Sequence, residues 1–467
     1  MNEYISLSKQ VYHTKLFGFQ TTPKRAKSGA NFSTMNLSQS YNDSNILYHQ
    51  DSCLNPIEEA SSIKIRIQDQ SRSLNDILSI FKSFNVEITR IQSKSYPNWQ
   101  EKYTTTYYLD YQRGLQEQLK MILIQQLEAI SQSVEQLKLP VVPWFPQQLS
   151  DLDGIENLTI QTESEAQKLE LLYFKDKNYQ KRRKLIGLAA SQYKINDKSL
   201  PIIEYTDNDN YVWDYCFTRL SKLYKNIACE EFNWAIDQFK KQFSNFEQKV
   251  PQLNDVSIYL QSQTGWRLKP VAGMLSKREF LNGLAFKVFH CVQYVRHHSV
   301  PLYAYEPDII HDLLGHGPMF AIQDFSDFSQ QLGIASLGVS DEELEKLAAI
   351  YMYTIEFGMC REKGQLKAYG AGLMGSVNEL EYCVSDKPQH LPFNPYVICR
   401  DHMNYPLNAI QPLYFVVDSF SDVTKLISDY CNQINRPFNA TYNSKQQRIF
   451  LDKEVRMVKA INKVPSL

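Results

Sequence analysis

Three prolines within seven residues divide this sequence into two parts of different character. Pro140, Pro143 and Pro146 lie around the apolar pair Trp144-Phe145. Proline lacks a backbone N–H and restricts the residue before it, so this segment predicts an extended link and not a helix. At roughly 100–200 residues per domain, 467 residues are enough for more than one domain. The prolines therefore predict a domain boundary.

Before the link, short apolar patterns change between periods of two and of three to four residues. Ile63, Ile65 and Ile67 alternate with polar residues, which is typical of a half-buried strand. The order of such segments is β-α-β-β-α-β, the ferredoxin-like pattern, which regulatory domains of the ACT type share with many unrelated modules. The expected strands lie near residues 63–67, 86–91, 104–111 and 134–137, and the expected helices near 74–81 and 119–130.

After the link the chain reads as mainly helical. Long helices are expected over Lys181–Tyr193, Trp213–Asn226 and Cys229–Phe243, and a β-hairpin over residues 438–451. The first 58 residues are rich in Ser, Asn and Gln and bury little apolar area, so a disordered polar tail is expected, with a transit peptide as the alternative. The predicted domains are 1–58, a tail; 59–139, an ACT-like regulatory domain; 140–434, a catalytic domain; and 435–467, a hairpin and oligomerisation segment.

Charge and cysteine usage restrict the function. Fifty Lys and Arg against 51 Asp and Glu leave a net charge of −1, so neither a nucleic-acid nor a membrane partner is expected. There is no run of 18 apolar residues and no apolar signal region, which favours a cytoplasmic location. The eight cysteines form no CxxC pair. Reduced, buried thiols are therefore expected, and a cysteine-based zinc site is not.

The segment YEPDIIHDLLGHGPMF contains two histidines, His311 and His316, at a spacing of five. On an ideal α-helix this spacing places them about 140° apart. The zinc-protease pattern HExxH has a spacing of four. The pair can converge if one histidine lies at a helix end, and Pro307 permits a helix start near Asp308. By itself the pair is better explained by ordinary packing or local hydrogen bonding than by metal binding.

The segment LAAIYMYTIEFGMCR reads as an apolar helix over Leu347–Arg361 with one acid, Glu356. A buried carboxylate needs a cation, a hydrogen-bond network or a metal. A salt bridge to an arginine is one reading. The other adds Glu356 to the two histidines, as in the two-His, one-carboxylate triad of non-haem Fe(II) oxygenases.

The same segments resemble a known family. YEPDIIHDLLGH, YTIEFG and KAYGAG are similar to signature segments of the pterin-dependent aromatic amino acid hydroxylases, and matching motifs follow in order over about residues 140–455. The resemblance, nearest to the phenylalanine 4-hydroxylating members, implies a mainly α catalytic domain of the family's type. An α+β ferredoxin-like (ACT) domain would precede it. It also implies a monooxygenase of phenylalanine catabolism that uses Fe(II), O2 and tetrahydrobiopterin on a free aromatic amino acid.

Carried over to this sequence, the resemblance implies roles for individual residues. His311, His316 and Glu356 match the iron ligands, and Arg296 matches the arginine that binds the substrate carboxylate, a task that suits a planar guanidinium. The residues matching the pterin site are Phe280, Ala272, Gly273, Leu275, Tyr351 and Asp312, with Glu379 lining the same cavity; those matching the substrate site are Met352, Gly375, Ser376 and Leu407.

Several positions depart from the family pattern. Asp312 is one carbon shorter than the usual acid, Gly375 replaces a serine, Met352 replaces a large aromatic residue, and Ala304 and Tyr305 replace a threonine–proline pair. Leu407 stands where tyrosine hydroxylases carry an acid, and an apolar pocket favours an unhydroxylated ring. The expected substrate is therefore phenylalanine first, tryptophan (5-hydroxylation) second and tyrosine (3-hydroxylation) third.

Other readings stay open at this point. A non-catalytic amino-acid sensor with a silenced iron site belongs to a different class, and a structural zinc site is disfavoured because such sites prefer four closed ligands. No heptad repeat follows the hairpin, so a homodimer is expected in place of the family's tetramer. Allosteric binding of an effector by the ACT-like segment is left undecided.

Overall fold

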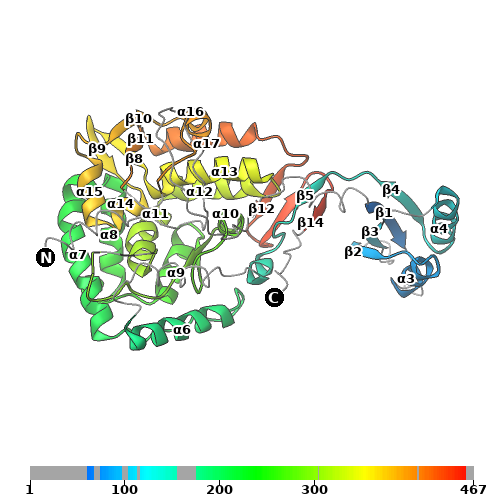
Figure 1. Cartoon of the computed structure of the whole chain (residues 1–467), viewed down its shortest axis with the longest axis horizontal. Coiled ribbons are helices and arrows are strands. Elements are labelled where there is room, and N and C mark those ends of the chain that lie inside the picture. Colours follow the sequence, from blue (N-terminus) through cyan, green and yellow to red (C-terminus); the bar gives the residue numbers. More distant parts are fainter. Residues whose placement is uncertain are drawn as a thin grey trace, which may run out of the picture. The chain divides into compact units, whose positions relative to one another are not determined.

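The computed structural model describes residues 60–67, 74–96, 104–112, 116–154, 175–302, 304, 306–406 and 410–458. The polar tail expected over residues 1–58 lies outside them. The described chain forms two compact units, drawn in Figure 1. The larger unit is Phe145–Asp452, and the smaller consists of residues 60–144 with 453–458. The change between units falls inside the proline-rich link. The functional domains at 59–139, 140–434 and 435–467 stay predictions.

The smaller unit has the predicted β-α-β-β-α-β order. Its four antiparallel strands lie in the order β2-β3-β1-β4, so that the first and third strands are central. Ile63 lies opposite Leu109 in the register of the central pair. The elements are β1 (Ala60–Ile67), α3 (Leu74–Ser83), β2 (Ile88–Tyr96), β3 (Thr104–Gln112), α4 (Glu117–Ile130) and β4 (Ser133–Leu137).

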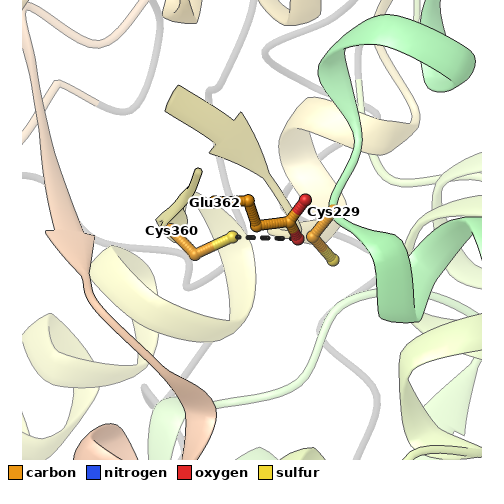
Figure 2. A group of neighbouring side chains, drawn as sticks. All are labelled: Cys229, Cys360 and Glu362. Atoms are coloured by element: carbon orange, nitrogen blue, oxygen red, sulfur yellow. Dashed lines mark hydrogen bonds between the residues drawn. The ribbon is translucent and has the colours of Figure 1, made fainter. Parts of the chain in front are cut away.

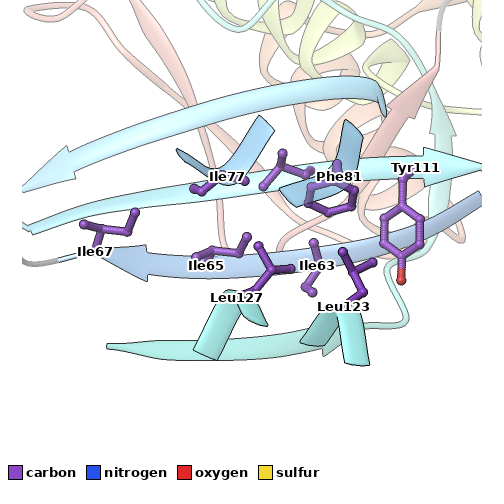
Figure 3. Packing of buried hydrophobic residues seen from close by; sticks show 9 residues of the cluster. Ile63, Ile65, Ile67, Ile77, Phe81, Tyr111, Leu123 and Leu127 are labelled. Atoms are coloured by element: carbon purple, nitrogen blue, oxygen red, sulfur yellow. The ribbon is translucent and has the colours of Figure 1, made fainter. Parts of the chain in front are cut away.

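One apolar cluster holds the two helices on this sheet, as Figure 3 shows. The isoleucines of β1 share one face because side chains alternate along a strand, and α3 and α4 each contribute a pair four residues apart. Each fully buried side chain of this size stabilises the fold by about 1.5–3 kcal/mol relative to an exposed one. The buried residues are Ile63, Ile65, Ile67, Ile77, Phe81, Leu109, Tyr111, Leu123 and Leu127.

A buried acid fastens the C-terminal segment to the smaller unit. Asp110 on β3 accepts hydrogen bonds from Ser62 Oγ (2.6 Å) and from Arg90 Nε (2.8 Å). Arg456 Nε lies 3.8 Å from the same carboxylate. Arg456 belongs to strand β14 (Arg456–Val458), which pairs in parallel with β5 (Val141–Pro143). The charge of Asp110 is therefore matched by two guanidinium groups and a hydroxyl.

The larger unit is mainly helical, as predicted, and the long helices expected from the sequence are present as α6, α7 and α8. In Figure 1 the helices α12 and α13 run side by side, and α12 also packs on α10 and α17. The helices are α6 (Lys177–Gln192), α7 (Asp207–Ile227), α8 (Glu230–Gln242), α9 (Leu253–Gln263), α10 (Lys277–Leu284), α11 (Gly317–Phe320), α12 (Gln323–Ser336), α13 (Asp341–Tyr351), α14 (Ala371–Met374), α15 (Val377–Cys383), α16 (Pro395–Asp401) and α17 (Phe420–Asn432), with a 3-10 turn at Leu149–Gly154.

Short strands complete the larger unit. A four-stranded sheet has the order β10-β11-β8-β9, in which β8 and β9 form a hairpin and the other pairs are parallel. The C-terminal hairpin expected from the sequence is formed by β12 and β13. The strands are β6 (Arg267–Pro270), β7 (Val288–Cys291), β8 (Met359–Glu362), β9 (Gln365–Ala368), β10 (Gln389–Pro392), β11 (Leu413–Val417), β12 (Ala440–Asn443) and β13 (Arg448–Leu451).

The expectations about cysteines and about membrane-spanning helices can be compared with the described residues. Their seven cysteines are all free thiols, and five of them are buried. Among the same residues, no helix is both long and apolar enough to cross a membrane.

Candidate active site

Two π-helical turns carry the residues on which the sequence analysis depended. They are His311–His316, labelled η3, and Met352–Glu356, labelled η4. In each, a backbone N–H donates to the carbonyl five residues earlier: Gly317 to Asp312, and Phe357 to Met352 at 2.9 Å. Residues five apart therefore lie about one turn apart and share a face. The expected separation of about 140° was wrong because it assumed α-helical geometry.

The segment around Glu356 also differs from its prediction. The helix α13 ends at Tyr351, the π turn follows, and by Met359 the chain has entered strand β8. The expected continuous helix to Arg361 was therefore wrong over its last residues. The apolar run that suggested a longer helix is equally suited to a buried strand, and periodicity alone does not separate the two.

The three side chains meet. Nε2 of His316 lies 3.1 Å from Nε2 of His311 and 3.1 Å from Oε1 of Glu356. Nε2 of His311 lies 3.5 Å from Oε2 of Glu356. Ligand atoms about 2.1 Å from one ion and at right angles to each other are about 3.0 Å apart. The observed separations thus fit one triangular face of a six-coordinate metal site.

The electrostatics of the carboxylate support the same reading. Glu356 is fully buried, and the hydroxyl of Tyr351 donates to its Oε1 at 3.0 Å. Burial alone raises the pKa of this carboxyl, but the imidazoles of His316 and His311 outweigh it and lower the pKa to about 2. Among the described residues, Oε2 of Glu356 has no hydrogen-bond partner. A buried ionised oxygen left in this way is suited to binding a cation.

Aromatic rings extend from the triad toward the residues matched to the pterin site. Phe280 is buried on α10, which begins with a capping box formed by Ser276 and Glu279. The ring of Phe280 packs edge-on against Tyr351, with centroids 5.2 Å apart, and at 5.9 Å from Phe289. Phe289 in turn lies 4.5 Å from the ring of His316. The matched loop residues Ala272, Gly273 and Leu275 lie in the segment between β6 and α10.

The carboxylate of Asp312 is already hydrogen-bonded within the protein. Its Oδ2 accepts a hydrogen bond from the backbone N–H of Val292 at 2.8 Å. Burial raises the pKa of Asp312 well above its usual range, although the Val292 N–H lowers it in part. His290, on β7 two residues before Val292, is a residue that sequence reasoning missed. Both ring nitrogens of His290 are buried without a hydrogen-bond partner among the described residues, and burial, with Lys269 nearby, lowers its pKa to about 3.

Arg296 is buried, not exposed on the surface. Its Nε and Nη2 donate to the two carboxylate oxygens of Asp308 at 2.9 and 2.7 Å, and the backbone N–H of Arg296 donates to Asp308 as well. This two-pronged contact fixes the plane of the guanidinium. Asp308 also accepts from the backbone N–H of His311 at 3.2 Å. One carboxylate therefore links the orientation of Arg296 to the start of the π turn that carries the histidines.

A second ion pair supports this region from α6. Arg183 pairs with Glu306, and its guanidinium lies 3.9 Å from the ring centroid of Tyr294. The hydroxyl of Tyr294 donates to the carbonyl of Pro307 at 2.7 Å. These contacts hold the segment that leads from Arg296 to His311. The sequence motif contained Glu306 and Asp308, but nothing in it showed which arginines they would meet.

The remaining matched residues lie close to the histidines or in the fold around them. A Cβ at Gly375 would lie 3.2 Å from the Cα of His311, so this position directly neighbours the triad. Ser376 is buried, and its hydroxyl caps α15 by accepting from the N–H of Glu379. Glu379 itself accepts from Gln411 and Tyr414. Met352 is buried at the start of η4. Leu407 and Tyr305 lie outside the described residues.

Comparison with known proteins shows the family of the chain. The family model for the biopterin-dependent aromatic amino acid hydroxylases matches residues 143–466. Phenylalanine-4-hydroxylase of Rattus norvegicus is 40% identical over 84% of this chain and 86% of its own length. The Dictyostelium discoideum enzyme of that name is 38% identical over 85% of this chain and 90% of its own. Tryptophan 5-hydroxylase of Xenopus laevis is 37% identical over 85% and 83%.

A solved structure of Chromobacterium violaceum phenylalanine hydroxylase, with bound iron(III) and 7,8-dihydrobiopterin, is 28% identical with a TM-score of 0.48. It covers 53% of this chain and 90% of that one. The family match spans more than half of the present chain, and the sequence relatives cover most of it. The chain therefore belongs to the biopterin-dependent aromatic amino acid hydroxylases.

Proposed function

We propose that this protein hydroxylates the ring of free L-phenylalanine to give L-tyrosine, using O2, ferrous iron and tetrahydrobiopterin. The observation that carries the proposal is the convergence of His311, His316 and Glu356 with separations of 3.1–3.5 Å. Relatives named phenylalanine-4-hydroxylase support phenylalanine over tryptophan as the substrate. The sensor alternative is disfavoured because the departures from the family pattern leave the triad assembled.

The three side chains would bind the iron through Nε2 of each histidine and the Glu356 carboxylate. Bound there, ferrous iron activates O2 with electrons supplied by the tetrahydropterin. The chain's own residues supply orientation and exclude water. Tyr351 holds Oε1 of Glu356, and the buried aromatic rings around His316 keep the site dry.

Arg296 would bind the carboxylate of the amino acid. Asp308 fixes the guanidinium plane, so little side-chain freedom is lost when an anion binds. The substrate ring would then be directed past Gly375 and Met352 toward the triad. Phe280, with the loop containing Ala272, Gly273 and Leu275, would hold the pterin, its ring stacked on Phe280. Asp312, tied to Val292, would face the same cofactor.

The function is tested by supplying the iron-loaded protein with tetrahydrobiopterin, O2 and one aromatic amino acid at a time. Tyrosine formed from phenylalanine is the expected result, identified by mass spectrometry with ¹⁸O2 to trace the inserted oxygen. 5-Hydroxytryptophan as the only product would favour the tryptophan alternative. Amino-acid binding without any product would favour the sensor.

The role of Arg296 has a separate test. Arg296→Lys keeps the charge but loses the two-pronged geometry, so KM for phenylalanine should rise at least about tenfold while iron content stays unchanged. Arg400→Lys is a matched control, because Arg400 is exposed and pairs with its neighbour Asp401. An unchanged KM in Arg296→Lys would remove this residue from the substrate site.

The smaller unit is proposed to be an ACT-like regulatory domain, because its strand order and length are those of that domain type. We also infer a homodimer, formed through the C-terminal hairpin, and a cytoplasmic location. Light scattering of the purified protein tests the first of these two inferences. Calorimetric titration with phenylalanine, on a Glu356→Gln variant that cannot turn it over, tests whether a second binding site exists in addition to the active site.

A further inference from the structure

Two cysteines and a glutamate that the reaction does not use lie together in the larger unit. Cys229 is the N-cap residue of α8, whereas Cys360 and Glu362 belong to strand β8. Their sulfur and carboxylate oxygen atoms all lie within 4.8 Å of one another, and Cys360 Sγ is 3.9 Å from Oε1 of Glu362. Figure 2 shows the three side chains next to one another, with the sulfur of Cys360 directed at the carboxylate of Glu362. Thiolate and carboxylate are the ligands that zinc-like cations accept.

The cluster is buried on one side and open on the other. Cys229 has no exposed surface and Cys360 is 4% exposed, whereas Glu362 is only half-buried. A cation could therefore reach the two sulfurs past the carboxylate. Sites with three protein ligands leave a fourth tetrahedral position for water. The arrangement is that of an exchangeable site and not of a closed structural one.

Backbone groups already orient the potential ligands. The N–H of Phe232 donates to Sγ of Cys229 at 3.3 Å, and the N–H of Glu230 donates to Oε1 of Glu362 at 2.8 Å. Both amides belong to the first turn of α8, where the helix carries a partial positive charge. In metal sites, hydrogen bonds to the ligating sulfur and carboxylate atoms typically orient these ligands.

The hairpin geometry fixes the other side of the cluster. Strands β8 and β9 are joined by Lys363-Gly364, whose φ values are 50° and 80°. Positive φ at both positions is typical of a two-residue type I′ turn, which sets the register of the strands it joins. The N–H of Cys229 donates to the carbonyl of Ala368 at 3.0 Å, so α8 is attached to the same hairpin.

A buried hydroxyl nearby is left without a partner. Tyr369 is fully buried, and among the described residues its OH has no hydrogen-bond partner. Burial raises its pKa most, and Cys360 and Cys229 raise it further, which places both thiols in its electrostatic surroundings. Burial likewise raises the pKa of Cys229, so its sulfur carries a proton until a cation displaces it.

We propose that Cys229, Cys360 and Glu362 bind one zinc-like divalent cation at a second metal site, distinct from the His311–His316–Glu356 triad. Binding releases the two thiol protons to solvent and leaves two thiolates and one carboxylate on the ion, with water as the fourth ligand. Sulfurs about 2.3 Å from a tetrahedral zinc are about 3.8 Å apart, so small side-chain rotations close the present cluster around the ion. The cation would join the start of α8 to β8, the strand that follows η4 directly.

The test uses Cd²⁺ as the probe, on the reduced, iron-loaded full-length protein. Cadmium thiolates absorb in the near ultraviolet, whereas cadmium bound to imidazole and carboxylate does not, so the band reports this site and not the triad. One equivalent of Cd²⁺ should produce the band, and Zn²⁺ should remove it by competition. The absence of a band in the reduced protein would overturn the proposal. Binding of several equivalents of Cd²⁺ that Zn²⁺ does not displace would overturn it as well.

Variants assign the ligands. Cys229→Ser and Cys360→Ser should each lose the band, while Glu362→Gln should keep it with affinity weakened by about tenfold or more. Cys431→Ser is the matched control, because Cys431 is a half-buried thiol outside the cluster. Circular dichroism checks that each variant folds. If the buried cysteine variants do not fold, the half-buried Glu362 decides: an unchanged cadmium affinity in Glu362→Gln would overturn the three-ligand site.

Discussion

Two buried carboxylates, one in each unit, have opposite surroundings. Asp110 in the smaller unit has partners for both oxygens, from Ser62 and Arg90. Glu356 in the larger unit has a hydrogen-bond partner for Oε1, whereas Oε2 has no hydrogen bond among the described residues and only the imidazole of His311 3.5 Å away. Both are almost fully inaccessible to solvent. Burial alone therefore does not separate a structural acid from one that binds a cation.

The two carboxylates differ in what their removal should affect, the fold or a bound ion. The charge of Asp110 is matched within the protein, so removing the carboxylate takes away the negative charge that Arg90 and Arg456 face. The charge of Glu356 faces two imidazoles that are themselves metal ligands by type. Removing it should affect a bound ion more than the fold. The predictions below test this distinction, from the largest expected effect to the smallest.

Glu356→Gln should abolish iron binding and turnover while leaving the metal-free fold intact. The amide keeps the shape but supplies a poor ligand, and iron affinity should fall at least about a hundredfold. Iron per chain after desalting, measured by emission spectrometry, is the readout. Glu381→Gln is the control, since Glu381 is exposed on α15. Full iron content in Glu356→Gln would remove this carboxylate from the ligand set.

Asp110→Ala should destabilise the smaller unit and leave iron binding unchanged. It breaks a partly buried ion pair, and breaking a fully buried one typically costs about 3–5 kcal/mol of stability; iron content should not change. Hydrogen exchange measured by mass spectrometry should show lost protection in β1 and β3 but not in the larger unit. Asp76→Ala, an exposed position on α3, is the control. Unchanged protection would mean that the pairing of Asp110 contributes nothing to the fold.

Tyr351→Phe removes the hydroxyl that donates to Glu356 and keeps the ring that packs on Phe280. Groups that donate a hydrogen bond to a metal ligand typically change metal affinity by about tenfold. Competition with an iron chelator measures the change. Tyr353→Phe is the control, because Tyr353 lies in the same π turn and its ring packs on Tyr405 and Phe415. Equal affinities in the two variants would contradict a role for the Tyr351 hydroxyl.

The smallest effect concerns pH. His290 has a pKa of about 3 in the folded protein, whereas an unfolded histidine titrates near 6.5. Below about pH 6.5 the unfolded chain takes up a proton that the folded chain excludes, so stability is complete above that pH and falls as the pH drops toward 3. At pH 6 the loss is about 1 kcal/mol.

The pH effect should belong to the larger unit, because residues 60–144 contain no histidine. Urea midpoints measured from pH 7.5 to 5.5 test it. His290→Gln should flatten the slope, whereas His402→Gln, at a half-buried position, should not. Equal slopes in both variants would show that His290 does not cause the dependence.

The periodic parts of the fold were accessible from the sequence. Alternating isoleucines in β1 and pairs four apart in α3 and α4 predicted the smaller unit's element order, because burial on one face imposes these periods. The three long helices and the C-terminal hairpin were found for the same reason. The short parallel strands β8, β10 and β11 were not, because four or five residues are too few to show a decisive period.

The site was predictable in residue type but not in geometry. His311, His316 and Glu356 were candidates for one cluster, but α-helical angles placed the histidines apart, and only the π turns bring them together. The partners of Arg296 and Arg183 depend on long-range packing. The thiol cluster escaped notice because the search for cysteine ligands relied on local spacing, whereas Cys229 and Cys360 are distant in the chain.

Each π turn holds one residue more than the α-helical turn that the same backbone would otherwise form. A single-residue deletion within either turn would restore regular backbone pairing and yield a locally more ordinary helix. It would also rotate a ligand side chain by roughly a quarter-turn away from the other two. In these two places helical regularity and the proposed iron site are competing demands, and a stabilising design that regularises the backbone should remove that site.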